Sequence, residues 1–387
     1  MSGLLFGQAV FFVSVGLILY VYFGYPLLMF LLARLTSSTV ARAEIEPTVS
    51  FIITAFNEER DIRKKLENTF ALDYPSDKLE IIVASDASTD GTETIVREFA
   101  GRGVKLVRQT QRRGKTAAQN LAVEHAAGEI LVFSDATSKY ERNAVRELTA
   151  NFADRSVGCV AGKLVYSDPA GTIVGSGARS YWSYESMLKE SESRACSLIG
   201  VSGCIYAVRR ANYVPMYPEA CSDFLIATLI YKQGLRTVYE PGAVCAEETN
   251  RESGKEMKMR VRVISQTFTD LWRNREMLNP FRAGIYAVQL LSHKVLRYSV
   301  PIFLAAALVS SGLLAFDSTL FLLVFAVQAC FYGLAAAAWV LERAGINGGP
   351  LSVPLYFVLA NVASAAGFFQ FLRGERYAAW EPIRDPR

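Results

Sequence analysis

The 387-residue sequence has few of the features that mark thiol, zinc or nucleic-acid chemistry. Its six cysteines form no CxxC pair and show no zinc-ligand spacing, so we expect reduced thiols on the cytosolic side of a membrane. The net charge is only +4, which does not select nucleic acid as a partner, although basic residues in the middle of the chain suit phosphate. There is no internal repeat and no low-complexity tract. We therefore expect neither a repeat protein nor a nucleic-acid partner.

Long uncharged runs lie near both ends of the chain. Hydrophobic residues make up 51% of the sequence, a high fraction for a soluble protein. Residues 4–35 carry no charge before Arg34 and are too long for the core of a signal peptide, so we predict a transmembrane helix with a kink at Pro26. Residues 295–316, 319–341 and 351–372 each approach the roughly 20 apolar residues that span a membrane. A buried bundle of helices is the alternative.

The sequence leaves the orientation of these runs open. If the central part of the chain is cytoplasmic, four crossings put both termini outside, but the arginine-rich tail favours the inside. In that case one apolar segment lies in the membrane interface instead of crossing. Residues 280–296 have the amphipathic pattern for such a helix.

Residues 48–250 alternate short β-rich runs with helical patterns. This order predicts right-handed β-α-β units on a mostly parallel sheet, with helices beginning at residues 57–58, 89–90, 115 and 142. The expected strands are residues 49–54, 80–84, 105–108, 129–134, 158–164, 203–208 and 236–239. The expected organisation is a transmembrane helix (1–35), a linker (36–47), the α/β domain (48–250), amphipathic or interfacial helices (251–294), three transmembrane helices (295–372) and a polar tail (373–387).

Polar side chains follow two of the predicted strands, at the edge where open α/β sheets bind ligands. The first strand runs into AFNEE at residues 55–59, and the second runs into SDASTDG at residues 85–91. A turn and a helix cap explain most of the second motif but do not require Asp86. We interpret the Asp86 carboxylate as a hydrogen-bond acceptor for a base or a ribose.

Two further motifs suit phosphate and metal. Gly114-Lys115 opens a helix whose free N–H groups favour anions, without the spacing of a P-loop; a solvated basic loop is the alternative. Asp135 ends a buried strand and Thr137 follows two residues later. Such oxygen ligands can hold Mg²⁺ or Mn²⁺ against a diphosphate, and a helix cap is the alternative.

The remaining motifs lie on helices. Asp223 opens an amphipathic helix, where an acidic residue ordinarily interacts with the helix dipole, and catalysis is the functional alternative. Residues 255–272 form a basic helix before the apolar runs, a pattern typical of binding to lipid headgroups. Arg260 and Arg262 on this helix could instead clamp a diphosphate.

Taken together, these motifs resemble a family-2 glycosyltransferase of the GT-A fold. The motifs AFNEE, SDASTDGT, RRGK (112–115), FSDAT (133–137), YWSYE (181–185) and GCIYAVRR (203–210) occur in the family's order. The apolar flanks, with YFGYP near the N-terminus, are similar to those of bacterial exopolysaccharide and lipid-linked oligosaccharide transferases. The resemblance implies an α/β, Rossmann-like domain on the cytoplasmic face of the inner membrane, with one N-terminal and about three C-terminal transmembrane helices.

The resemblance also implies a role for each matching position. Asp223 would be the catalytic base, and Arg260 with Arg262 would hold the diphosphate leaving group. The nucleotide, with Asp86 on the uracil edge, would be bound by Thr54, Ala55, Phe56, Glu58, Asp86, Lys115 and Asp135. The acceptor would meet Gly203, Cys204 and Trp272, and the metal would meet Asp135 and Thr137.

Three departures from the family pattern stand out. The DxD motif reads Asp135-Ala136-Thr137, without its second carboxylate, and the ED pair reads Ser222-Asp223. The QxxRW motif of processive synthases is absent, which argues against a cellulose-like synthase.

We therefore expect an inverting, metal-dependent transferase that uses Mg²⁺ or Mn²⁺. It would move a sugar from a UDP-sugar to a polyprenyl-linked or growing saccharide at the membrane, with membrane lipids as further partners, in cell-surface polysaccharide synthesis. The alternatives are a processive synthase of the chitin or hyaluronan type and an inactive nucleotide-sugar-binding scaffold, which the altered motifs motivate. A transporter is not expected, because no charged residue lies in the middle of a predicted span.

Overall fold

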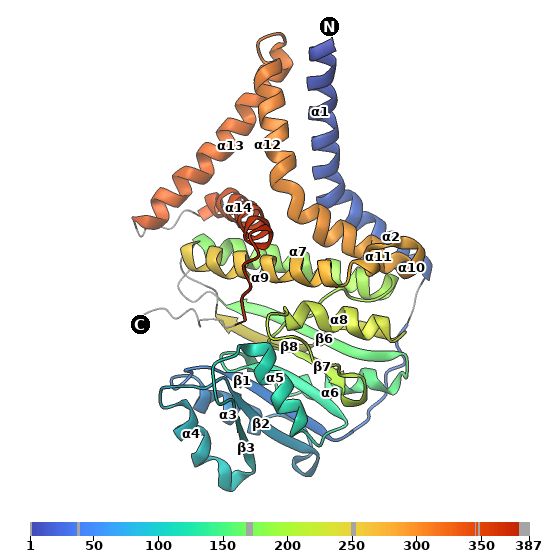
Figure 1. The fold of residues 1–387 in the computed structure, drawn as a ribbon, viewed down its shortest axis with the longest axis vertical. Helices are drawn as coiled ribbons and strands as arrows, with labels where there is room; N and C mark the ends of the chain where they lie inside the picture. Colours follow the sequence, from blue (N-terminus) through green and yellow to red (C-terminus); the bar gives the residue numbers. More distant parts are fainter. Residues whose placement is uncertain are drawn as a thin grey trace.

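The protein consists of an α/β domain, a layer of helices above it and long helices that project away from that layer (Figure 1). The computed structural model describes residues 2–36, 39–167, 173–248, 253–344, 346 and 349–378. The helix layer contains α7 (Ile173–Ala195) and α9 (Ser253–Arg273). The N-terminus and the turn between α12 (Arg297–Leu314) and α13 (Thr319–Arg343) lie at the end of the molecule opposite the sheet.

The α/β domain is built on one eight-stranded sheet in the order β3-β2-β1-β4-β7-β6-β8-β5. The first four strands in this order are parallel, so their carboxyl ends meet at one edge. The register places Thr54 beside Asp135 and Ala55 beside Ser85. The strands are β1 (Val49–Ala55), β2 (Leu79–Ser85), β3 (Val104–Arg108), β4 (Ile130–Asp135), β5 (Lys139–Tyr140), β6 (Val157–Ser167), β7 (Tyr206–Arg209) and β8 (Arg236–Glu248).

Helices cover both faces of this sheet because successive side chains of a strand point to opposite sides. Phe51 and Ile53 belong to the core under one set of helices, whereas Ile52 belongs to the core under the other. The first core is covered by α3 (Ile62–Phe70), α4 (Thr92–Glu98) and α6 (Ala144–Ala150). The second is covered by α5 (Lys115–Glu124) and α8 (Ser222–Lys232). The predicted α/β class with a mostly parallel sheet is confirmed.

Two helices begin later than the sequence pattern indicates. Residues 57 and 87 both have positive φ angles, 54° for Asn57 and 56° for Ala87. That conformation belongs to turns and cannot continue into a right-handed helix. The polar motifs therefore form open loops after β1 and β2, and α3 and α4 start several residues further on.

Strand β8 is much longer than the predicted strand at residues 236–239. Its pairing with β6 shifts register, from Gly162 opposite Glu240 to Lys163 opposite Val244. A bulge thus accommodates the Pro-Gly pair at residues 241–242, which the sequence pattern would place at a strand end. The strand resumes beyond the bulge and carries Glu247 to the open edge of the sheet.

The N-terminal helix bends, in line with the predicted kink near Pro26. Helix α1 (Ser2–Leu19) passes through a π-helical turn, Tyr20–Gly24, into α2 (Tyr25–Thr36). Inserted π-helical turns are a recognised cause of such bends. Figure 1 shows α1 projecting away from the sheet, whereas α2 turns to run beside α7.

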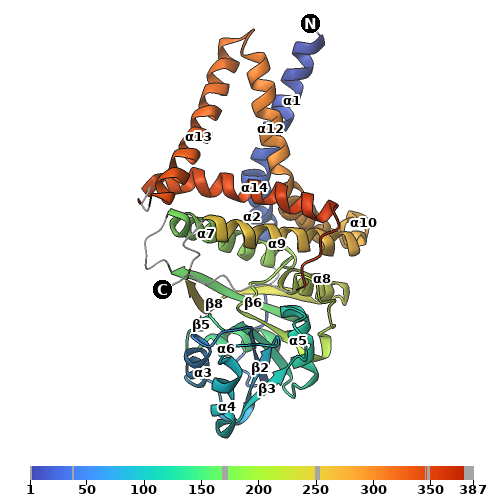
Figure 2. The same ribbon diagram turned by 60° about the vertical axis from the view of Figure 1, so that its left-hand side comes forward.

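The C-terminal part contains three further long apolar helices, as predicted. They are a helical stretch from Ile285 to Leu314, then α13 (Thr319–Arg343) and α14 (Ser352–Leu372). The stretch comprises α11 (Ile285–Gln289), a π-helical segment (Leu290–Leu296) and α12 (Arg297–Leu314), and a short α10 (Pro280–Ala283) precedes it. With residues 4–36, the described part of the chain contains four helical stretches that are long and apolar enough to cross a membrane. Figure 2 shows that α14 lies along α9, at a steep angle to α12 and α13.

Candidate active site

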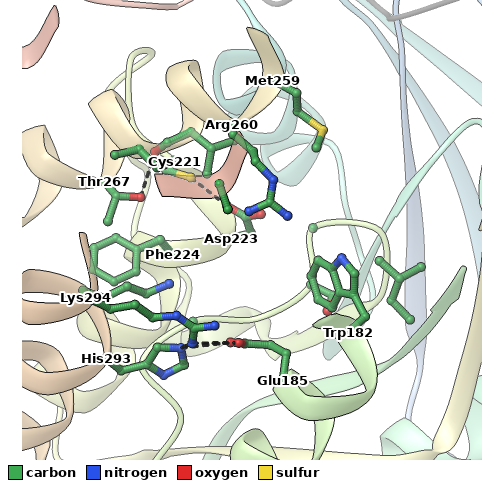
Figure 3. A pocket seen from close by; sticks show the side chains of 18 of the residues that line it. Trp182, Glu185, Cys221, Asp223, Phe224, Met259, Arg260, Thr267, His293 and Lys294 are labelled. Atoms are coloured by element: carbon green, nitrogen blue, oxygen red, sulfur yellow. Dashed lines mark hydrogen bonds and ion pairs between the residues drawn. The ribbon is translucent and has the colours of Figure 1, made fainter. Parts of the chain in front are cut away.

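A cavity of about 500 Å³ lies between the open edge of the sheet and the helix layer. Lys115, Asp135 and Asp223 line it from the α/β domain. Arg260 on α9 and Lys294 on the π-helical segment line it from the other side. In Figure 3, Asp223 and Arg260 lie together in the upper part of the view, and Glu185 and His293 lie below them. One space is thus bounded by sheet-edge carboxylates and by helices that lead into the apolar segments.

Lys115 joins three parts of the site. Its ammonium group forms an ion pair with Asp135 and donates a hydrogen bond of 3.3 Å to the carbonyl of Gly203. Burial alone would lower the pKa of Lys115, but the Asp135 carboxylate outweighs it and the pKa is raised. A Cβ atom at Gly203 would lie 3.1 Å from Asp223 Oδ2 and 3.2 Å from Lys115 Nζ. The loop at Gly203 therefore approaches both side chains as closely as only glycine allows.

Asp223 lies in the first turn of α8 and faces the cavity. The thiol of Cys221 donates a hydrogen bond of 2.9 Å to its Oδ1 atom. Its backbone carbonyl accepts a hydrogen bond of 2.8 Å from the N–H of Val201, in the segment that leads to Gly203. The carboxylate is thus fixed next to the Gly203 loop, with one oxygen directed at the space that the glycine leaves open.

A second carboxylate, Asp270 on α9, holds the residue that precedes α8, on which Asp223 lies. It accepts hydrogen bonds from the hydroxyl of Tyr217 and, at 3.0 Å, from the backbone N–H of Cys221. Burial raises the pKa of Asp270 to about 8, although both hydrogen bonds act in the opposite direction. No local sequence pattern marks Asp270, because it resembles any acidic residue of an amphipathic helix.

Glu247 on β8 also lines the cavity and is not among the residues predicted from the sequence. Burial, followed by the negative charge of Asp135, raises the pKa of Glu247 to about 8, and Lys115 partly offsets this. Two carboxylates that repel each other in one cavity are suited to share a divalent cation. Among the described residues, no group of three or more His, Cys, Asp and Glu side chains is arranged to hold a metal ion by itself. The pair nevertheless fits Mg²⁺ or Mn²⁺, which commonly takes one or two carboxylates and completes its shell with phosphate oxygens and water.

A buried lysine stabilises the turn after Asp135 by hydrogen bonding. Lys65 donates hydrogen bonds to the carbonyl of Ser138 at 2.7 Å and to its hydroxyl at 3.2 Å, and burial lowers the pKa of Lys65 to about 8. The hydroxyl of Thr54 lies 3.4 Å from Asp135 Oδ1. Thr137 is exposed and lies outside the lining of the cavity. The structure thus places Thr54, rather than Thr137, beside the Asp135 carboxylate.

The other predicted nucleotide-binding residues lie at the same sheet edge, around Asp86. The Asp86 carboxylate accepts hydrogen bonds from the backbone N–H of Arg113 at 2.8 Å and of Gly114 at 3.0 Å. Burial raises the pKa of Asp86 despite these bonds. The guanidinium of Arg112 lies 3.9 Å from the ring centre of Phe56. Asp86 thus shapes the loop before Lys115, and Ala55, Phe56 and Glu58 are buried beside it without lining the cavity.

Basic residues of α9 border the cavity. Arg260 pairs with Glu256 at 2.8 Å and donates a hydrogen bond to Tyr356 of α14. Burial lowers the pKa of Arg262, whose Nε atom is buried without a hydrogen-bond partner among the described residues. Trp272 is 62% exposed and outside the cavity. Arg260 and Arg262 thus join the cluster of predicted site residues, together with Gly203 and Cys204, whereas Trp272 does not.

The wall nearest the long apolar helices holds a buried charged cluster. His293 contacts Glu192 at 2.7 Å through Nδ1 and Glu185 at 3.0 Å through Nε2. Arg297 pairs with Glu185 at 3.1 Å. His293 and Arg297 pull the pKa of Glu185 well below its usual range although burial alone would raise it. This cluster joins α7 to the segment before α12, a long-range contact that no local sequence pattern indicates.

A known family model matches part of the α/β domain. Residues 50–213 match the family model "Glycosyl transferase family 2". Glycosyltransferase AglE of Haloferax volcanii is 31% identical over 151 residues, 38% of this chain and 49% of that protein. Poly-beta-1,6-N-acetyl-D-glucosamine synthase of Staphylococcus aureus is 26% identical over 220 residues, 55% of this chain and 53% of that protein. The chain thus spans about half the length of these curated relatives.

A solved structure resembles nearly the whole chain. Mannosyltransferase PcManGT from Pyrobaculum calidifontis, in complex with GDP-Man and Mn²⁺, is 25% identical, with a TM-score of 0.72. The match covers 95% of this chain and 100% of that one. The similarity therefore extends beyond the sheet to the helices around it, and the GT-A fold inferred from the sequence motifs is confirmed.

Proposed function

Because residues 50–213 form a glycosyl transferase family 2 domain, we propose that the protein transfers a sugar from a nucleotide-diphosphate donor to an acceptor held at the membrane. One observation carries the proposal: a single cavity connects Asp135 and Asp223 with α9, α14 and the segment before α12. An acceptor anchored in the membrane can reach the sheet edge through this cavity, without leaving the layer of apolar helices.

The donor would lie along the sheet edge. The loops at residues 54–58 and Asp86 would hold the nucleoside, and Lys115, Arg260 and Arg262 would balance the charge of the diphosphate. Burial favours this assignment, because cations in a low-dielectric cavity interact more strongly with phosphate than cations in water do. The sequence resemblance favours uridine as the base, while the similar solved structure contains GDP-Man, so both nucleotides belong in the test.

Asp135 and Glu247 are the residues that would hold Mg²⁺ or Mn²⁺. Glu247 would supply from β8 the carboxylate that the Asp135-Ala136-Thr137 motif lacks. Such a cation, when bound, would neutralise charge on the diphosphate leaving group. The mutual repulsion of the two carboxylates supports this assignment, because it is relieved when a cation binds between them.

Asp223 is the proposed catalytic base. Its free oxygen faces the space beside Gly203, where an acceptor hydroxyl would attack the anomeric carbon from the side opposite the leaving group. The proton of that hydroxyl would pass to the Asp223 carboxylate, so the reaction is a single displacement with inversion. Gly203 and Cys204 would form the floor under the acceptor.

A panel of UDP-sugars and GDP-sugars, incubated with the full chain in membranes, tests the proposal. We expect release of one nucleoside diphosphate with label appearing in the lipid fraction. If no donor is cleaved, with or without Mn²⁺, the chain is the inactive scaffold that its altered motifs also allow.

A processive polysaccharide synthase is the second candidate. The partial similarity to the poly-beta-1,6-N-acetyl-D-glucosamine synthase of Staphylococcus aureus favours it. The length of the product formed by the purified chain separates the two functions. A single added sugar supports a simple transferase, and a polymer supports a synthase.

We infer that the α/β domain faces the cytoplasm and that α14 lies in the membrane interface. Helix α14 packs along α9, where a Cβ atom at Gly367 would meet Ile264 at 2.9 Å. Because α9 also carries Arg260 and Arg262, a membrane-spanning α14 would draw these charges into the hydrocarbon region. With α1, α12 and α13 as the crossings, Arg343 and the arginine-rich tail fall on the same side as the α/β domain.

Labelling with a membrane-impermeant maleimide tests this arrangement. In a Cys330→Ser background, we expect Ser318→Cys, between α12 and α13, to react in intact cells. Glu375→Cys, after α14, should react only after permeabilisation. Reaction of Glu375→Cys in intact cells would show that α14 crosses the membrane.

A further inference from the structure

We propose that Lys65 on α3 is a positioning residue of the proposed metal site, because it holds the segment that connects Asp135 with Glu247. The inference rests on the proposed function, since it concerns the part of the cavity that would bind the donor. Lys65 itself lies outside the lining of the cavity, so it would touch neither the metal nor the donor and would act through other residues.

Lys65 interrupts the buried face of α3. Ile62, Leu66 and Thr69 are the other buried residues of this helix, and their spacing places all four on one side. Lys65 is 2% exposed and forms no ion pair with any residue that the structure describes. A buried ammonium group is costly, so an apolar side chain of similar length would serve packing better. The lysine therefore indicates a task for its charged group.

The ammonium group of Lys65 fixes the turn that follows Asp135. It donates hydrogen bonds of 2.7 Å to the carbonyl of Ser138 and of 3.2 Å to its hydroxyl. The Ser138 hydroxyl donates a hydrogen bond of 2.9 Å to the backbone carbonyl of Asp135 and lies 2.9 Å from the hydroxyl of Ser134. The ring centre of Tyr140 lies 4.2 Å from the ammonium group. Lys65 thus contacts the turn at both of its ends.

The same segment pairs with the strand that carries Glu247. Strand β5 lies antiparallel to β8, opposite residues 245–246, which directly precede Glu247. Asn68, almost one helical turn further along α3, donates a hydrogen bond of 2.9 Å to the carbonyl of Tyr140 and accepts one of 2.8 Å from its N–H. Residues 138–140 therefore join the two carboxylates, and α3 holds this junction with two side chains.

Tyr140 extends this support to the loop at Gly203. Its hydroxyl donates hydrogen bonds of 3.0 Å to the carbonyl of Phe133 and of 2.9 Å to that of Cys204. Phe133 lies on β4, two residues before Asp135, and Cys204 lines the cavity. One buried group of residues thus sets the relative positions of the proposed metal ligands and of the loop beside the proposed base.

The charge of Lys65 and its positioning act on metal affinity in opposite directions. Burial lowers the pKa of Lys65, and Glu247 and Asp135 are among the groups whose charge acts against this effect. The ammonium group is therefore close enough to repel a cation bound between them. If Lys65 acted through its charge alone, a neutral side chain would strengthen metal binding. If it acts through position, a neutral side chain weakens metal binding, because the two ligands lose their fixed separation.

Binding of Mn²⁺ to the full chain in nanodiscs, with UDP or GDP present, tests the proposal. The electron paramagnetic resonance of free Mn²⁺ reports binding without any turnover. We expect Lys65→Met to raise the Mn²⁺ concentration for half-maximal binding about tenfold or more, while the Kd for the nucleotide in EDTA is unchanged. Ser138→Ala removes the hydroxyl between Lys65 and the Asp135 carbonyl and should raise this concentration about threefold to tenfold. This second variant decides the matter if Lys65→Met does not fold.

Two variants of the same helix are the controls. Lys64→Met removes the charge of the exposed neighbour and should bind Mn²⁺ as the wild type does. Leu66→Ala removes buried methyl groups from α3 and leaves the hydrogen bonds of Lys65 in place, so it reports the effect of lower stability alone. Unchanged or tighter Mn²⁺ binding in Lys65→Met, or an equal loss in Leu66→Ala, would overturn the proposal.

The same measurements separate this inference from the proposed function. If the variants bind Mn²⁺ as expected but the wild type cleaves no nucleotide sugar, the proposed transfer fails and the role of Lys65 stands. If the wild type binds no Mn²⁺ with either nucleotide, the metal assignment and the role of Lys65 both fail, and transfer measured in EDTA decides the proposed function separately.

Discussion

The backbone N–H of Cys221, two residues before Asp223, donates a hydrogen bond of 3.0 Å to the carboxylate of Asp270. Through this bond α9 fixes the residue from which α8, and with it Asp223, begins. The helix that borders the cavity thus also sets the position of the proposed base.

Replacing Asp270 should change the pH dependence of stability. The pKa of Asp270 is raised to about 8 in the folded protein, so the folded state holds a proton that the unfolded state releases near pH 4. The stabilising effect of this proton is complete below about pH 4 and is lost as the pH rises to about 8, with a slope of at most about 1.4 kcal/mol per pH unit. Asp270→Asn keeps an acceptor for Cys221 and removes the titration.

Melting temperatures of wild type and Asp270→Asn, measured from pH 5.5 to 8.5, check this expectation. The advantage of the wild type over the variant should shrink as the pH rises and level off above about pH 8. Two parallel curves would contradict the assigned pKa shift.

Replacing Asp223 should separate binding from transfer. Asp223→Asn keeps the size and the hydrogen bond from Cys221 but cannot accept a proton at neutral pH. We expect transfer to fall about 10²–10⁴-fold while the Kd for the nucleotide is unchanged. Asp77→Asn, at an exposed position before β2, is the control. Near-normal turnover of Asp223→Asn would refute its role as base.

Replacing Glu247 should weaken the metal site. Glu247→Gln removes one of the two proposed ligands, so the Mn²⁺ concentration for half-maximal binding should rise about tenfold or more. Because bound metal displaces the proton of Glu247, wild-type affinity should increase with pH up to about 8, and the variant should lose this increase.

The Mn²⁺ affinity in the presence of nucleoside diphosphate, followed by the electron paramagnetic resonance of free Mn²⁺, gives a readout independent of turnover. Glu248→Gln is the control, because Glu248 is the exposed neighbour of Glu247. Unchanged affinity in Glu247→Gln would mean that Asp135 holds the metal without help from β8.

A methyl group at position 203 should crowd the reacting centre. In Gly203→Ala the new Cβ atom would lie 3.1 Å from Asp223 and 3.2 Å from Lys115, so both side chains must shift by a few tenths of an ångström. We expect kcat to fall about tenfold to a hundredfold with little change in melting temperature. Gly101→Ala has open space around its Cβ position and should behave as wild type.

The contact between α9 and α14 can be tested through stability. Gly367→Ala would place a Cβ atom 2.9 Å from Ile264 and from the carbonyl of Val261, and overpacking of this kind costs about 1–3 kcal/mol. Gly333→Ala on α13 meets no atom within 4 Å and should be neutral or stabilising, because alanine favours the helix. Equal melting temperatures would mean that α14 is not held against α9.

The sequence predicts those parts of the site that follow from strand order. Asp86 follows β2 and Asp135 ends β4, the two strands on either side of β1. The carboxyl ends of parallel strands meet at one edge of a sheet, so the position of both residues at this edge could be inferred without coordinates. The position of Lys115 could be predicted for the same reason, since Lys115 begins the helix that follows the next strand along the chain. The four apolar helical stretches were equally clear from their length alone.

Other site residues depend on contacts that no local pattern records. Glu247 was missed because the Pro-Gly pair at residues 241–242 indicates a strand end, whereas a bulge lets β8 continue. The apolar run at residues 243–246 before two glutamates was the available signal. Asp270 and Lys189 each occupy an ordinary position in a helical sequence pattern. Their contacts involve partners that only the folded chain brings close.

The N-terminal bend connects the first helix to the wall of the cavity. The Tyr20 hydroxyl lies 2.9 Å from that of Ser292, and the Tyr25 hydroxyl donates to Glu192, which also contacts His293. Removal of residues 2–36 would therefore take a hydrogen-bond donor away from the buried carboxylate of Glu192, which lines the cavity. The bend between α1 and α2 therefore also contributes, through Tyr22, to the lining of the cavity.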